Sequence, residues 1–243
     1  MTRRRFIADT WSPATGTATS ATLIGDQAVH LARVLRAEPG QIYDVVANGF
    51  LHRAEIVSAS EQQVVFTLHE ELESGSALPL HLLIAIFKFD HLEWAIEKAT
   101  ELGIAKITPI LARRTEKHLS LAAPKRVERW RRIALESSKQ SRRTDIPEIA
   151  EPVTLKLALE RETSPTRILL SETEQATTLL AALQTSSSTS QTALAIGPEG
   201  GWAPEEMFLF VDRQWLPVTL GPRILRAETA AIAAIAIAAT QLG

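Results

Sequence analysis

The chain has 243 residues, 45% of them hydrophobic, a length that allows one large domain or a small and a medium one. Its formal net charge of −2 confines any nucleic-acid-binding surface to a local patch. The lack of cysteine excludes disulfides and thiolate chemistry, the scattered histidines favour no metal site, and the short apolar runs predict a cytoplasmic protein with no signal peptide or membrane span.

The first 72 residues are predicted to form a small β-barrel domain. Their apolar, β-branched character indicates short strands at residues 6–8, 22–24, 43–47, 54–57 and 63–68. One helix interrupts them, with Asp26 as its cap and an apolar rhythm of three or four residues at Ala28, Leu31, Val34 and Leu35. Gly, Ser and Pro then predict a linker at residues 73–79.

From residue 80 onward the chain alternates strands with helices, which predicts a mostly parallel α/β sheet. Apolar runs indicate strands at residues 80–87, 104–111, 167–170, 192–196 and 216–220. Helices are expected near residues 92–102, 124–142, 176–183, 203–211 and 226–241, with Gly103 ending the first. Trp94 and Trp130 fall at core spacing on their helices, and Trp202 suits either core packing or the wall of a ligand site.

A first candidate for chemistry directly follows the strand at 192–196 and reads Gly197-Pro198-Glu199-Gly200-Gly201. Glycine and proline let a backbone bend sharply and approach a ligand closely. Parallel sheets bind their ligands at the carboxyl ends of strands, where this segment would lie. An ordinary strand-to-helix turn explains the segment equally well, and the spacing is neither that of a dinucleotide fingerprint nor that of a P-loop.

A second candidate is the segment 220–230, with the sequence LGPRILRAETA, which again leads from a strand into a helix. The helix dipole favours Glu228 in the first turn, so capping explains that residue. Capping does not explain Arg226, because a cation at a helix N-terminus is electrostatically unfavourable. A neighbouring anion would offset it, such as a phosphate, a cofactor carboxylate or Glu228 itself.

These two segments resemble the closing motifs of the RsmE-type 16S rRNA uridine-N3 methyltransferases, a family of the SPOUT superfamily. The resemblance extends in the same order to residues 4–6, 30–36, 93–103, 129–134 and 140–142, so it covers nearly the whole chain. The chain departs from the family pattern at residues 46–49, 87–90 and 139–140.

The resemblance implies a PUA-like β-barrel RNA-binding domain at residues 1–72, a linker at 73–79 and a SPOUT trefoil-knot methyltransferase domain at 80–243. It further implies S-adenosylmethionine as cofactor, 16S rRNA in the small ribosomal subunit as substrate, and a homodimer formed by the methyltransferase domain. The cofactor is expected on three strand-to-helix loops, with backbone groups binding the adenine. The expected cofactor residues are Leu170, Ser171, Gly197, Pro198, Glu199, Gly200, Gly201, Leu220, Gly221, Ile224 and Leu225.

A basic stripe runs from Arg113 to Arg143, with eleven Lys and Arg against three Glu, about +8 in a chain of net charge −2. A solvated helix face with internal pairs such as Arg132–Glu136 is the alternative. We favour RNA, because too few acids are present to pair the cations and phosphate neutralisation uses such a stripe. The expected RNA-binding residues are Arg4, Arg5, Arg33, Arg36, Lys88, Arg113, Arg114, Lys125, Arg129, Arg132, Gln140 and Arg142.

Methylation of uridine N3 requires an unpaired base and loss of the N3 proton. Glu228 is a candidate for the base that accepts this proton, and Arg226 for the group that stabilises the charge on the uracil oxygens. Two other functions remain open: a SPOUT enzyme acting on tRNA or a ribose hydroxyl, and a non-catalytic RNA-binding factor. A nucleotide-phosphate enzyme would lack its P-loop lysine.

Overall fold

The computed structural model describes residues 5–12, 19–174, 176–185 and 191–243. It divides into two compact units, Met1–Ser76 with Ser138–Asp145, and Ala77–Ser137 with Ile146–Gly243. Each unit has a hydrophobic core of its own. Within these described residues, no helix combines the length and apolarity needed to cross a membrane, and no three His, Asp or Glu side chains group as metal ligands would.

The first unit contains a six-stranded mixed sheet with the order β1-β4-β5-β6-β3-β2. The strands are β1 (Arg5–Ile7), β2 (Thr10–Ser12), β3 (Thr19–Ile24), β4 (Ile42–Ala47), β5 (Phe50–Ala59) and β6 (Gln63–Leu72). β1 and β2 lie at opposite ends of this order but are successive parts of one segment. The amides of Ala8 and Asp9 bond the carbonyls of Val46 and Thr22, so this segment closes the sheet into the predicted barrel.

The helix of the first unit differs from its prediction. It consists of α1 (Gly25–Val29) followed by a π-helical turn, η1 (His30–Val34). Ile24 occupies the N-cap without a side-chain bond, so the prediction that Asp26 caps the helix is wrong. Ala28 and Leu31 are buried, whereas Val34 is 64% exposed, because a π turn takes more residues than an α turn and rotates Val34 away from the core.

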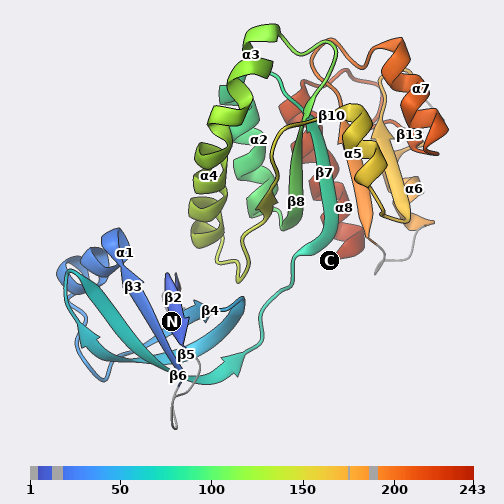
Figure 1. Cartoon of the computed structure of the whole chain (residues 1–243). Coiled ribbons are helices and arrows are strands. Elements are labelled where there is room, and N and C mark those ends of the chain that lie inside the picture. The colour runs from blue at the N-terminus through green and yellow to red at the C-terminus, as the bar shows by residue number, and fades with distance from the viewer. Residues whose placement is uncertain (1–4, 13–18, 175, 186–190) are drawn as a thin grey trace. The chain divides into compact units, whose positions relative to one another are not determined.

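The second unit is built on a fully parallel seven-stranded sheet with the order β10-β8-β7-β12-β11-β13, in which β9 also pairs with β8 (Figure 1). Its strands are β7 (Leu78–Ala85), β8 (Ile104–Leu111), β9 (Glu148–Ile149), β10 (Val153–Thr154), β11 (Thr166–Leu170), β12 (Thr192–Ile196) and β13 (Leu216–Val218). All five predicted strands are present. The two-residue strands β9 and β10 are too short to leave a pattern in the sequence.

Helices cover both faces of this sheet (Figure 1). They are α2 (Phe89–Glu101), α3 (Lys117–Ala122), the 3₁₀ turn η2 (Ala123–Arg126), α4 (Val127–Gln140), α5 (Leu155–Arg161), α6 (Leu179–Gln184), α7 (Pro204–Asp212) and α8 (Ala227–Leu242). α3 and α5 were not predicted, and the basic helix predicted at 124–142 begins as η2 and ends at Gln140. Gly103 follows α2 with a φ of 97°, as expected for a glycine that ends a helix.

Successive side chains of a strand point to opposite faces of the sheet, so each set packs against different helices. Leu82 and Ile84 of β7 pack with α2, α4, α6 and α8, whereas Leu83 and Ala85 pack with α5 and α7. Trp130 is fully buried in the first of these cores, as predicted. Trp94 is 49% exposed, so its assignment to the core is wrong: it lies on the outer side of α2.

A polar network also ties α5 to the sheet. His81 Nδ1 of β7 lies 2.5 Å from Glu162 Oε2, and its Nε2 lies 2.8 Å from Thr108 Oγ1. Burial raises the pKa of Glu162, but the hydrogen bonds from His81 and Ser164 outweigh it and lower that pKa from 4.5 to about 2. The Glu162 carboxylate therefore stabilises the folded chain.

Candidate cofactor site

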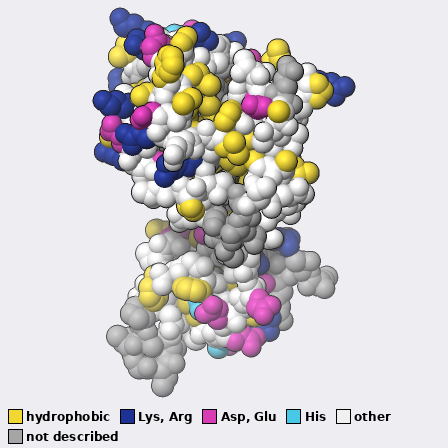
Figure 2. Space-filling view, turned by 90° about the vertical axis from the view of Figure 1, so that its right-hand side faces the viewer, with side chains coloured by type: hydrophobic (Ala, Val, Ile, Leu, Met, Phe, Trp, Pro, Cys, Tyr) yellow, Lys and Arg dark blue, Asp and Glu magenta, His cyan; other side chains and the backbone are white. Residues whose placement is uncertain are grey.

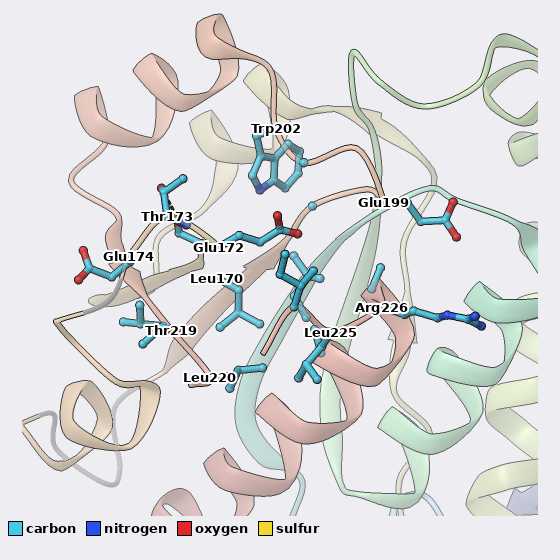
Figure 3. A pocket seen from close by; sticks show the side chains of 18 of the residues that line it. Leu170, Glu172, Thr173, Glu174, Glu199, Trp202, Thr219, Leu220, Leu225 and Arg226 are labelled. Carbon is cyan, nitrogen blue, oxygen red and sulfur yellow. Dashed lines mark hydrogen bonds between the residues drawn. The ribbon is translucent and has the colours of Figure 1, made fainter. Parts of the chain in front are cut away.

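A cavity of about 1050 Å³ opens at the carboxyl ends of β11, β12 and β13 (Figure 3). Both glycine-proline bends, 197–201 and 220–226, contribute to its lining. The structure thus brings together every residue that the sequence suggested for the cofactor. These residues are Leu170, Ser171, Gly197, Pro198, Glu199, Gly200, Gly201, Leu220, Gly221, Ile224 and Leu225. A cavity of this size at this edge of a parallel sheet suits a nucleoside-sized ligand.

Trp202 forms one wall of the cavity and packs against the first bend (Figure 3). A Cβ atom added to Gly197 would lie 3.1 Å from Trp202 Nε1, so only glycine fits there without displacing the ring. Trp202 also meets Phe210 edge-on, with ring centroids 5.0 Å apart. Both roles considered for Trp202, core packing and a wall of the site, therefore apply together.

Two hydrogen bonds hold the first bend, one within it and one from Arg114. Gly201 adopts a φ of 72° and donates its amide hydrogen to the Pro198 carbonyl at 2.8 Å, which closes a tight turn. The guanidinium of Arg114, from the loop after β8, donates to the carbonyl of Gly200. Arg114 was predicted to bind RNA, but the structure places it on the cavity lining.

The second bend is fixed by Thr219 and Gly221. The amide of Gly221 donates to Thr219 Oγ1, and that hydroxyl donates to the Gly221 carbonyl, both at 3.1 Å. Gly221 has a φ of 117°, which a residue with a side chain rarely adopts. Leu220 and Leu225 then lie below Trp202 in the view of Figure 3, and Ile224 is 82% exposed.

The loop after β11 contributes more than the sequence suggested. Beyond Leu170 and Ser171, the cavity is lined by Glu172, Thr173 and Glu174 (Figure 3). The Ser171 and Thr173 hydroxyls lie 3.0 Å apart, and Glu174 accepts the amide hydrogens of Ala176 and Thr177. Their position directly after a buried parallel strand is the signal that could have identified them.

The two predicted catalytic residues lie in different surroundings. Arg226 is exposed on the cavity lining at the N-cap of α8, and no residue in the described part of the chain forms an ion pair with it. Glu228 is 2% exposed, does not line the cavity, and has its Oε1 atom 3.4 Å from His91 Nδ1 of α2. Glu228 is therefore not the anion that offsets Arg226. Glu199 is the carboxylate on the same side of the cavity as Arg226 (Figure 3).

Acids pair part of the basic stripe, two of them from outside it. Glu93 of α2 lies 2.8 Å from Arg129 and 3.5 Å from Arg126, and Arg131 pairs with Glu128 and Glu151. Counting acids within residues 113–143 missed Glu93 and Glu151. Five cations of the stripe that were predicted to bind RNA form no ion pair within the described chain. They are Arg113, Arg114, Lys125, Arg132 and Arg142. In Figure 2, Lys and Arg side chains of the second unit lie mainly on the left of the view, with others at the top and right.

The remaining residues predicted to bind RNA are Lys88, Gln140 and four arginines of the first 72 residues. Lys88 is exposed at the N-cap of α2. In the first unit Arg33 and Arg36 are exposed at the π turn, Gln140 is exposed, and the guanidinium of Arg5 donates to the carbonyl of Arg142. Arg4 lies outside the described residues.

The chain is similar to known RNA methyltransferases along most of its length. Residues 74–239 match the sequence profile of the RNA methyltransferase domain family. The chain is 36% identical over 222 residues to Ribosomal RNA small subunit methyltransferase E of Synechocystis, which covers 89% of this chain and 72% of that protein.

Two solved structures with S-adenosylmethionine bound are similar to the chain throughout. The putative methyltransferase of Legionella pneumophila in complex with the cofactor is 28% identical, with a TM-score of 0.80 and coverage of 99% of this chain and 98% of that one. The Ribosomal RNA small subunit methyltransferase E of Neisseria gonorrhoeae bound to the cofactor is 26% identical, with a TM-score of 0.81 and coverage of 98% of both chains.

Proposed function

This chain belongs to the family of ribosomal RNA small subunit methyltransferases E, and on that premise we propose that it methylates N3 of one uridine in 16S rRNA. It is an S-adenosylmethionine-dependent rRNA methyltransferase, and its fold is the predicted one, a SPOUT α/β domain preceded by a β-barrel. The two bends, 197–201 and 220–226, line a single cavity although Gly201 and Leu220 are 19 positions apart in the sequence. This observation supports the proposal most.

The residues of the cavity fit S-adenosylmethionine. Trp202, Leu170, Leu220 and Leu225 give the cavity an apolar lining, and Gly197 lies close against the Trp202 ring. The glycines let backbone groups approach a ligand closely, which suits the edge of an adenine ring. When bound, the cofactor supplies a methyl carbon activated by its sulfonium, so the protein has mainly to align it and exclude water.

The chain itself must assist the departure of the uridine N3 proton. We assign to Arg226 the stabilisation of the negative charge that develops on the uracil oxygens, because it is exposed on the lining and lacks an ion-pair partner among the described residues. For the proton acceptor we favour Glu199 over Glu228, because Glu199 is exposed on the lining whereas Glu228 is buried beside His91. A Glu199→Gln enzyme should therefore be slower in single turnovers than Glu228→Gln at equal folded concentration.

We propose the following organisation around this site. Residues 1–72 form the RNA-binding barrel and 80–243 the methyltransferase domain, which pairs with a second copy to form a homodimer. Of the predicted linker 73–79, Leu78 and Pro79 belong to β7. Arg113, Lys125, Arg132 and Arg142 of the basic stripe bind rRNA phosphates, whereas Arg114 lines the cofactor cavity. The enzyme works in the cytoplasm on the small ribosomal subunit. Light scattering of the purified protein tests the dimer.

The decisive experiment supplies purified protein with methyl-labelled S-adenosylmethionine and small ribosomal subunits from cells that lack this enzyme. Nuclease digestion and mass mapping of the 16S rRNA should then locate one new N3-methyluridine. A protein that binds the cofactor in calorimetry but leaves the uridines unmodified, or labels tRNA or a ribose instead, would contradict the proposed substrate. No saturable cofactor binding would leave only a non-catalytic RNA-binding factor.

A further inference from the structure

Glu206 on the first turn of α7 is a buried carboxylate that does not line the cavity. It is 4% exposed. Its Oε1 atom accepts the amide hydrogen of Arg113 at 2.8 Å, and its Oε2 atom accepts that of Ala203, also at 2.8 Å. One side chain therefore joins the loop after β8 to the loop after β12, two segments that are far apart in the sequence.

Helix capping accounts for only one of these bonds. A glutamate at the third position of a helix commonly bonds the N-cap amide, here that of Ala203. The bond to Arg113 satisfies no group of α7. Since a buried carboxylate is costly unless its oxygens are hydrogen-bonded, the second bond also makes the position of the Arg113 loop depend on Glu206.

The Arg113 loop in turn touches the cofactor cavity through its next residue. Arg114 donates to the Gly200 carbonyl, and its Cδ atom lies 3.4 Å from where a Cβ of Gly200 would be. The two loops are thus joined at two points, Glu206 to Arg113 and Arg114 to Gly200. We call these four residues the loop clamp.

We infer that Glu206 is a positioning residue for the cofactor: through the loop clamp it sets the affinity for S-adenosylmethionine from outside the cavity. The inference rests on the proposed function in one respect, that the cavity holds this cofactor. If the role of Glu206 were limited to capping α7, its loss would lower the stability of the fold and leave the affinity of the folded protein unchanged.

The test compares Glu206→Gln with Glu205→Gln, an exposed neighbour on the same helical turn. An amide retains one acceptor oxygen, so Glu206→Gln loses one of the two bonds with little change in volume. Calorimetry should show about tenfold weaker cofactor binding for Glu206→Gln and a change of less than about twofold for Glu205→Gln. In turnover assays the KM for the cofactor should rise, while kcat at saturation stays within about threefold.

A second variant keeps the inference falsifiable if Glu206→Gln fails to fold. Arg114→Met retains the side-chain length but not the donor, and it should weaken cofactor binding by a similar factor. The double variant should bind the cofactor no more weakly than the more impaired single variant, because both substitutions act through the same loop clamp. Unchanged cofactor affinity in folded Glu206→Gln, or in Arg114→Met, would overturn the inference. A wild-type protein that binds no cofactor would instead overturn the proposed function.

Discussion

Replacing Gly197 by alanine tests whether the first bend and Trp202 form a single rigid wall of the cofactor cavity. The new Cβ would lie 3.1 Å from Trp202 Nε1 and 3.3 Å from Cδ1 and Cε2 of the same ring. Phe210 also packs edge-on against this ring, with centroids 5.0 Å apart, which limits how far the ring can move. Overpacking of this kind costs about 1–3 kcal/mol. If the ring relieves the strain by moving into the cavity, that cost weakens cofactor binding by about 5- to 150-fold.

Calorimetric titration with S-adenosylmethionine measures the affinity, and urea unfolding measures what part of the cost falls on stability. Gly75→Ala is the matched control, because its Cβ would meet no atom within 4 Å and its φ is not in the left-handed region. Adding Trp202→Phe, which has a smaller ring, to Gly197→Ala should restore part of the lost affinity. A Gly197→Ala protein with wild-type affinity and wild-type stability would refute the close packing of Gly197 on Trp202.

Three further predictions concern charge. Arg226→Met should lower the single-turnover methylation rate by about 10²- to 10³-fold. Cofactor affinity measured by calorimetry should change little. An equal loss of rate and of cofactor affinity would contradict the role assigned to Arg226. Arg132→Gln should reduce the slope of a plot of the logarithm of the rRNA association constant against the logarithm of the salt concentration by about 0.7–0.9. Arg131→Gln should leave that slope unchanged, because Arg131 is already paired with Glu128 and Glu151. Equal slopes for the two variants would refute this distinction. The pKa of Glu162 is about 2 in the folded chain against 4.5 ordinarily, so Glu162→Gln should cost about 3 kcal/mol above pH 5. That difference in unfolding free energy should shrink as the pH falls from 5 towards 2, because the wild-type carboxylate is then protonated too, and a difference independent of pH would contradict it.

Strands buried on both faces were the easiest elements to predict. β8 and β12 have the predicted bounds, because short segments rich in apolar and β-branched residues leave few alternatives for the chain. The first helix was less predictable. The spacing of Ala28 and Leu31 does not distinguish an α-helix from the π turn that follows α1, so the expected place of Val34 in the core was wrong.

The number of charged residues could be counted from the sequence, but the ion pairs that they form could not be predicted from it. The stripe from Arg113 to Arg143 was correctly identified as rich in cations. Glu93, however, approaches Arg126 and Arg129 from another helix. Ion pairs form between atoms a few ångströms apart in space, and distance along the chain does not report that separation.

The sequence by itself determined the strands of the parallel sheet, the two glycine-proline bends and, through their resemblance to a known family, the chemistry expected there. These are local properties, because apolar periodicity and glycine act over a few residues. Only the tertiary structure decided that the bends line one cavity, that Arg114 belongs to its wall and that Glu228 faces His91 instead. Those outcomes depend on the order of strands in the sheet and on how α2 and α8 pack, which no short stretch of sequence encodes.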